Sequence, residues 1–362
     1  EMQNSYLDFK SYSYKHLNNS SNQKWEYIYP SVNYNIYNYN DPLINRNWEI
    51  NNTLLNYRDI NKNHKQEFSS EFRSKDINVL KSIGLRFENV LQNRVIYFND
   101  TEDDFNQLRV FPQVSSKISF PLSKNDNIKS QILEPILMPI IAPYNNYRND
   151  QGVTNSNIFS LNRETSFSQW ESGPRINYGF NWLLNYNKFI INNTFGQSLK
   201  LNKDSEESSD EKSDYFITNI IDFKSFGYIQ TDLTIDSESM YLKENNINTN
   251  INITNAKFAF NYDYESNNRI KTSEQISIGT KINLLKDTDF IASIRKDLMT
   301  EKSIGNAMGI HYENDCLAIN FDYFRDFTAV GDIKNSHGFS FTITLKPFGT
   351  SKKRGITRNF GP

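Results

Sequence analysis

The stretch Ala256–Glu265, AKFAFNYDYE, decides the fold class. Its side chains separate into two sets at alternating positions: Phe258, Phe260, Tyr262 and Tyr264 in one, and Lys257, Asn261, Asp263 and Glu265 in the other. A period of two is typical of a β-strand, whose successive side chains point to opposite faces, whereas a helix has a period of 3.6. The stretch therefore predicts a strand with one apolar face and one face in contact with water.

The same alternation recurs along the chain. It is clear in Glu274–Leu284, Cys316–Arg325 and Gly338–Lys346, and each run has about the 9–11 residues of a tilted membrane strand. Weaker versions are Trp25–Tyr37, Trp48–Tyr57, Gly84–Tyr97, Leu108–Phe120, Arg175–Tyr186, Phe189–Leu199, 215–223, Phe226–Ile235, Ile247–Thr254 and 289–298. We expect roughly 14–18 strands in this chain.

Composition narrows the protein class. The net charge of −2 gives no electrostatic basis for binding nucleic acid, which requires a basic face. Only 37% of residues are hydrophobic, yet Phe and Tyr number 26 and 21, so aromatic residues supply much of the apolar surface. The most apolar stretch, Ile136–Tyr144, contains two prolines and falls far short of the ~18 residues of a membrane helix. A membrane location would have to come from strands closed into a barrel.

The predicted fold class is all-β: a transmembrane, antiparallel, up-and-down β-barrel, possibly incomplete in this chain. Long polar connections at Asn145–Gln169 and Lys200–Asp214 contrast with shorter ones elsewhere, as in outer-membrane barrels. We assign residues 1–347 to the barrel, as its C-terminal part, and 348–362 to a C-terminal tail. A soluble β-sandwich, whose strands also alternate, remains an alternative.

In a barrel of this kind, the polar faces would line the lumen. The predicted lumen-facing residues are Lys257, Asn261, Asp263, Glu265, Lys281, Asn283, Asn320 and Asp322.

Motifs for catalysis are absent from the sequence. None of the four histidines has a metal-ligand spacing, and there is no GxSxG, phosphate-loop or HExxH motif. We therefore predict no enzyme activity, cofactor or metal. The alternative is a barrel enzyme with a Ser–His or Asp–His site at its rim, for which His311, His337 and nearby aspartates offer residues without a decisive spacing.

Two regions resemble the family of the lipopolysaccharide-assembly outer-membrane protein LptD, also called organic solvent tolerance protein. The first, Leu108–Trp182, contains RVFPQVSSKISFPL, ILEPILMPIIAPY, NIFSLNR (Asn157–Arg163) and WESGPRINYGFNW (Trp170–Trp182) in that order. The second, Tyr312–Lys346, has a Cys before an alternating strand and a last strand ending in TLKPFG. Together they cover about a third of the chain.

The resemblance implies a barrel that inserts lipopolysaccharide into the outer leaflet of the bacterial outer membrane. It also implies two partners: an LptE-like plug lipoprotein in the lumen, and a periplasmic protein bridge that delivers lipopolysaccharide to an N-terminal jelly-roll domain. No jelly-roll region is evident here, and the chain starts at Glu1, so we expect a C-terminal or mature piece, or a reduced family member. Cys316 is predicted to pair with a cysteine upstream of this sequence.

In such a barrel the sugars would pass through the polar lumen while the acyl chains leave through a seam between the first and last strands. The last strand supplies the candidate seam residues Ser336, Gly338, Ser340, Thr342, Thr344 and Lys346; the opposing side of the seam is not identifiable. Prolines 112, 121, 135, 139 and 143 remove ladder donors, and bends or turns are the simpler interpretation of them. A passive porin or receptor barrel, or a soluble β-rich binding protein, are the alternative functions.

Overall fold

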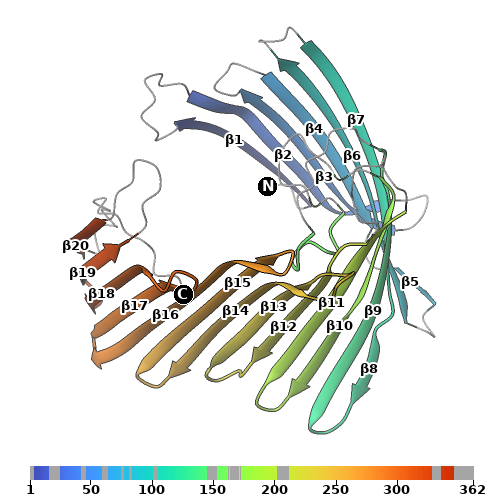
Figure 1. The fold of residues 1–362 in the computed structure, drawn as a ribbon. Helices are drawn as coiled ribbons and strands as arrows, with labels where there is room; N and C mark the ends of the chain where they lie inside the picture. The colour runs from blue at the N-terminus through green and yellow to red at the C-terminus, as the bar shows by residue number, and fades with distance from the viewer. Residues whose placement is uncertain are drawn as a thin grey trace. The chain divides into compact units, whose positions relative to one another are not determined.

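All twenty regular elements of the described residues are β-strands (Figure 1). The structure is a computed structural model, and it describes the chain apart from residues 1–3, 16–24, 42–45, 59–63, 75–76, 81–83, 101–104, 145–152, 162, 164–170, 172, 202–211, 328–335 and 346–362.

The strands follow one another along the chain with short interruptions. In order they are β1 (Ser5–Lys15), β2 (Trp25–Asp41), β3 (Arg46–Arg58), β4 (His64–Ser74), β5 (Ile77–Leu80), β6 (Leu85–Asp100), β7 (Phe105–Ser119), β8 (Leu122–Asn125), β9 (Lys129–Ile141), β10 (Arg175–Tyr186), β11 (Ile190–Lys200), β12 (Tyr215–Asp222), β13 (Gly227–Ile235), β14 (Leu242–Ile253), β15 (Ala256–Asn267), β16 (Ile270–Leu285), β17 (Thr288–Asp297), β18 (Ser303–Glu313), β19 (Leu317–Asp326) and β20 (Ser336–Leu345).

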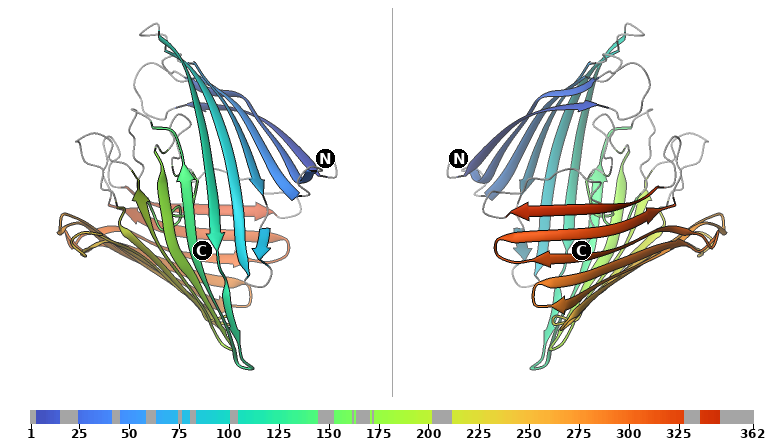
Figure 2. Two further views of the ribbon diagram at one scale, coloured as in Figure 1. Left: turned by 90° about the vertical axis from the view of Figure 1, so that its right-hand side faces the viewer. Right: turned by 90° about the vertical axis from the view of Figure 1, so that its left-hand side faces the viewer.

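The sheet has up-and-down topology. From β12 to β20 each strand pairs antiparallel with the next one along the chain, and Figure 2 shows the hairpins that result. The same order holds from β1 to β4, and β6 then joins β4 to β7. All twenty strands belong to one sheet. The predicted all-β, antiparallel, up-and-down architecture is confirmed.

Twenty strands exceed the expected 14–18 because two long strands are interrupted. β4 and β5 both pair with β6, where Arg73 opposes Val90 and Ile77 opposes Phe87, so β5 continues the line of β4. Likewise, β7 and β8 both pair with β9. The break between β7 and β8 falls at Pro121, which has no N–H to donate to a ladder.

The alternation did not predict β1, β4, β9 and β18, nor the short strands β5 and β8. β1 mixes Asp8 and Lys10 with Tyr6 and Tyr12 on one face, and β4 has only two phenylalanines, Phe68 and Phe72, among polar residues. In β18, glycine and alanine take most of the positions opposite the apolar ones. β4 and β18 are held by neighbours on both sides, and β1 by its pairing with β2, rather than by a strong pattern of their own.

The chain divides into two compact units. Unit 1 comprises Glu1–Leu122, Glu134–Phe180 and Gly196–Ser213, and unit 2 comprises Ser123–Leu133, Asn181–Phe195 and Asp214–Pro362. The predicted boundary at residue 347 and the predicted tail 348–362 lie outside the described residues.

The connections of unit 2 differ in length between the two ends of its strands. One end carries the turns 223–226, 254–255, 286–287 and 314–316, and the other carries 236–241, 268–269, 298–302 and 327–335. The tight turn at 268–269 is possible because Asn268 and Arg269 both adopt positive φ, +48° and +65°, as in the type I′ turns that join twisted hairpins. Short turns at one end and generally longer connections at the other match the expected pattern.

Candidate functional site

Apolar side chains of neighbouring strands lie in register on one side of unit 2, which we name the apolar face. Phe260 is opposite Thr249 on β14 and Ile278 on β16, and Ile278 is opposite Ile294 on β17. The face carries Ile229, Ile247, Ile251, Phe258, Phe260, Tyr262, Ile276, Ile278, Phe290, Ile294, Met308, Ile310, Phe321, Tyr323, Phe339, Phe341 and Ile343.

The apolar face is accessible rather than packed in a protein core. Phe341 is 62% exposed and Ile310 is 50% exposed, and Phe258 is also exposed. Contiguous apolar surface of this extent is rare on soluble monomers and marks contact with a membrane or another protein.

All eight residues predicted to face a lumen lie together on the opposite side of these strands, which we name the polar face. Lys257 is opposite Lys281, and two rows further on Asn261 is opposite Ser277. The row through Lys281 continues across Ile291 and Gly309 to Asp322. Asp263, Glu265, Asn283 and Asn320 occupy alternate positions on the same strands. The register thus gathers the eight residues from three strands, β15, β16 and β19, on one face. That this face lines a lumen stays a prediction.

Cross-strand hydrogen bonds and ion pairs link the polar face. The Nζ of Lys281 lies 2.6 Å from the Oδ2 of Asp289, and the Nη2 of Arg295 donates to the Oε1 of Gln275 at 2.7 Å. The Thr218 hydroxyl donates to the Oδ1 of Asp232 at 2.6 Å. Such pairs stabilise neighbouring strands, and their partly exposed charged groups require contact with water.

Unit 1 has the inverse of a soluble protein's distribution. On β4, Phe68 and Phe72 are exposed, while Glu67 on the other face is buried. The Nε of Arg94, also buried, donates to the Oε1 of Glu67 at 2.9 Å. Charged residues of soluble proteins are rarely buried and large apolar residues usually are, so this unit is built for apolar surroundings on its outside.

A buried cluster of charged residues lies on the polar side of unit 1, where β10 and β11 pair. The Nε of Arg163 donates to the Oε2 of Glu171 at 2.6 Å, and the Nη2 of Arg175 lies 3.1 Å from the same oxygen. Arg163 also donates to the Ser198 hydroxyl, which donates to the Oδ1 of Asn177 at 2.7 Å. One carboxylate between two guanidinium groups compensates for much of the cost of burying them.

The same cluster holds the segment Thr154–Leu161 against the sheet. The carbonyl of Leu161 accepts a hydrogen bond from Arg175. The side chain of Ile158, which is 2% exposed, covers Gly196, where a Cβ atom would lie 2.7 Å from the Ile158 Cγ1. In the sequence, NIFSLNR and WESGPR carry only the family resemblance and predict no site. The features of the sequence that could have indicated this cluster are Arg163, Glu171 and Arg175, with the Gly-Pro pair 173–174 between the last two.

Cys316 lies in the turn 314–316, at the end of unit 2 with the shorter turns. Its N–H donates to the Oδ1 of Asn314 at 2.9 Å, and its side chain is exposed and unpaired within the described residues. The predicted disulfide to an upstream cysteine stays a prediction.

The predicted seam residues Ser336, Gly338, Ser340, Thr342 and Thr344 form the polar face of β20, and Lys346 lies outside the described residues. β20 pairs with β19 from Leu345 opposite Leu317 to Ser336 opposite Asp326.

Among the prolines, Pro139 coincides with a gap in the β7–β9 ladder. The ladder has pairs at Ser115–Ile140 and Ile118–Leu137, on the two sides of this gap.

Of the histidines and aspartates considered for catalysis, the structure brings together His311 and Asp322, with 2.6 Å between Nε2 and Oδ1. His337 is opposite Arg325 on the apolar face and does not join them. Gly309 makes room for the pair, because a Cβ there would lie 2.1 Å from the Oδ1 of Asp322. Within the described ranges no group of three or more His, Cys, Asp or Glu residues is arranged to hold a metal ion.

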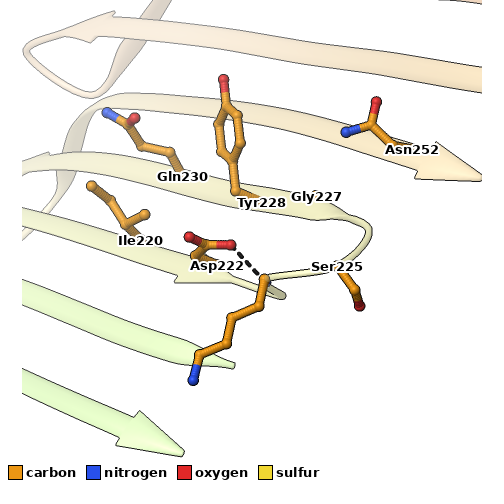
Figure 3. Close-up of a pocket in the computed structure, with 8 residues that line it drawn as sticks. Ile220, Asp222, Ser225, Gly227, Tyr228, Gln230 and Asn252 are labelled. Atoms are coloured by element: carbon orange, nitrogen blue, oxygen red, sulfur yellow. Dashed lines mark hydrogen bonds between the residues drawn. The ribbon is translucent and has the colours of Figure 1, made fainter. Parts of the chain in front are cut away.

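An open hollow lies on the polar face at the β12–β13 hairpin (Figure 3). Its lining comes from Ile220, Asp222, Lys224, Ser225, Gly227, Tyr228, Gln230 and Asn252. The Lys224 N–H donates to the Oδ1 of Asp222 at 2.7 Å, which closes the turn. Gly227 has a φ of +135°, and a Cβ there would lie 1.9 Å from the Asn250 carbonyl oxygen, so only glycine fits this position.

Comparison with known proteins gives distant likenesses to solved structures. No family model and no curated protein matches the chain. A mutant of Rh. blastica porin is 8% identical with a TM-score of 0.30, covering 80% of this chain and 90% of the porin. CdiB from Acinetobacter baumannii is also 8% identical, with a TM-score of 0.33, over 94% of this chain and 59% of CdiB.

The copper transporter OprC is 8% identical with a TM-score of 0.34, covering 94% of this chain and 71% of OprC. At these scores the likenesses decide nothing about function. Among the described residues, no helix is long and apolar enough to cross a membrane.

Proposed function

We propose that this chain is a transmembrane β-barrel of the bacterial outer membrane and that it transports an amphiphile. The observation that carries the proposal is the separation of the two faces: exposed Phe, Ile and Leu on one side, and hydrogen-bonded or buried charged groups on the other. Lipid would cover the apolar face, and an enclosed aqueous space would meet the polar face. A soluble β-rich binding protein would instead bury its apolar face.

The amphiphile we propose is lipopolysaccharide, inserted into the outer leaflet. Each acyl CH₂ gains roughly 0.8 kcal/mol on leaving water, while the sugars require hydration. A barrel with an apolar outer face and a polar inner face, opened at a seam, meets both requirements: the sugars stay in the lumen while the acyl chains pass into the lipid. β20 would form one side of that seam, with Phe339, Phe341 and Ile343 toward lipid and Ser340 and Thr342 toward the lumen.

The proposed partners follow from the resemblance of Leu108–Trp182 and Tyr312–Lys346. They are an LptE-like plug lipoprotein in the lumen and a periplasmic bridge acting through an N-terminal domain. Outer-membrane barrels have short turns on the periplasmic side, and Cys316 lies in such a turn. That position is compatible with a disulfide to a periplasmic domain.

Photo-crosslinking in growing cells tests the substrate. A photoreactive amino acid replacing Ser340, on the polar face of β20, is expected to crosslink lipopolysaccharide. The same group replacing Phe260, on the apolar face away from β20, is the matched control and should crosslink phospholipid. Depletion of the protein should lower lipopolysaccharide at the cell surface.

The second candidate is a passive porin or receptor barrel, which the polar face would serve equally well. Depletion that leaves surface lipopolysaccharide unchanged and reduces uptake of small solutes would favour that function and refute the first.

A further inference from the structure

Asparagine occupies four successive alternate positions of β14: residues 246, 248, 250 and 252. All four lie on the polar face, where Asn248 is opposite Gln230 on one side and Asn261 on the other. Asparagine is depleted in strands because its short side chain packs poorly there and competes for backbone hydrogen bonds. A row of four in one strand therefore calls for a role other than holding the sheet.

Part of this row is left available for a ligand. The Nδ2 of Asn250 donates to the Tyr228 hydroxyl at 2.7 Å and lies 3.5 Å from the Oδ1 of Asn248. Within the part of the chain that the structure describes, the side-chain amides of Asn246, Asn252 and Asn261 have no hydrogen-bond partner. Each amide offers two donors and one acceptor without a charge.

The row ends at the hollow of Figure 3, because Asn252 is one of the residues that line it. There Tyr228 stands up from the sheet between Gln230 and Asn252, with Ile220 and Asp222 on the neighbouring strand. A half-buried tyrosine presents an apolar ring face together with a polar hydroxyl. An apolar ring surrounded by amides and a carboxylate is the combination that a pyranose, with its C–H face and its ring of hydroxyls, requires.

The charges around the row determine which sugar fits. Asp222, Asp232 and Asp263 lie on the same face beside it. Lys224 directs its Nζ away from the row to the Oδ1 of Asn185 and the carbonyl of Tyr186. Lys257, opposite Asn252 on β15, is the one lysine of β13–β15 beside the row. One lysine against three carboxylates leaves an excess of negative charge, which disfavours a phosphate or an acidic sugar.

We propose that the Asn246–Asn252 row and Tyr228 form a binding track for uncharged saccharides. Successive amides on one face are about 7 Å apart, so one oligosaccharide can contact several of them in sequence. This inference rests on the proposed function, which requires the polar face to be in contact with water. It deepens that function by naming neutral sugar units as the part of the amphiphile that contacts β13–β15.

Binding of maltohexaose to the purified full chain in detergent micelles tests the proposal, with calorimetry as the readout. Wild type is expected to bind, and the double variant N248L/N250L should bind at least tenfold more weakly. T249L is the matched control, because Thr249 lies between the two asparagines but on the apolar face, and it should bind like wild type. Y228F removes one hydroxyl and should weaken binding roughly fivefold, as expected for one neutral hydrogen bond.

Three results would overturn the proposal: no binding by folded wild type, equal binding by N248L/N250L and T249L, or displacement of maltohexaose by glucose 6-phosphate. If the double variant does not fold, Y228F decides. The in-cell crosslink at Ser340 is independent of this assay, so sugar binding without crosslinking refutes lipopolysaccharide transport alone. Crosslinking without sugar binding refutes only the saccharide track.

Discussion

Replacing Phe260 by arginine tests the assignment of the two faces most directly. Phe260 is in the middle part of β15, and its cross-strand neighbours on the apolar face are Thr249 and Ile278. The nearest acid on this face, Glu274, is about 13 Å further along the neighbouring strand and already binds Lys271 and Tyr262. The new guanidinium would have no partner.

An arginine at the bilayer midplane of such a barrel costs about 2–4 kcal/mol. Since each 1.4 kcal/mol is a factor of ten, the F260R variant should shift the folding equilibrium by roughly 30-fold to 700-fold. Urea titrations of the chain refolded into lipid vesicles would measure it. The control is N261R, the adjacent position on the polar face, which is expected to stay within about 0.5 kcal/mol of wild type. Equal effects at the two positions, or a neutral F260R, would refute the placement of lipid on the apolar face.

Further substitutions test individual features. E171Q leaves two buried guanidinium groups without their carboxylate, so it should cost about 3–5 kcal/mol in unfolding free energy and expose Thr154–Leu161 to protease; resistance equal to wild type would contradict this. G227A should destabilise by about 1–3 kcal/mol, because its Cβ meets a backbone carbonyl. G279A, whose Cβ would make only an ordinary contact of 3.7 Å with the Ala259 Cβ, should be near neutral in the same urea titration. C316S should change the non-reducing gel mobility of the full-length protein, and identical mobility would remove the predicted disulfide.

From β12 to β20, the alternation of the sequence was sufficient to predict every strand except β18 and to predict which residues share a face. In Ala256–Glu265 the period-two pattern determines both the strand and its two faces, because neighbouring residues of a strand, such as Phe260 and Asn261, point to opposite sides of the sheet. The same argument failed for β4, where Glu67 and Arg94 stabilise each other across strands that are far apart in sequence. A cross-strand ion pair leaves no periodic trace in either strand.

The charged cluster of unit 1 was beyond sequence reasoning for a related reason. Arg163, Glu171 and Arg175 come from a connection and the strand after it, and Ser198 comes from the next strand. Their convergence depends on how the connection turns back onto the sheet at Gly196. Only the register of the neighbouring strands determines that path.

The alternation of apolar and polar residues also has a consequence for export of the unfolded chain. None of the described strands has an unbroken apolar run near the ~18 residues of a membrane helix; the longest apolar stretch, in β9, is interrupted by Pro139. An export channel in the inner membrane would therefore have no segment of these strands to release sideways as a helix. Two neighbouring strands form a continuous apolar surface only after they pair, as β15 and β16 do where Phe260 is opposite Ile278. If the chain is the outer-membrane barrel proposed above, apolar residues that are spaced along the sequence and brought together by strand pairing would let it cross the inner membrane and then insert into the outer one.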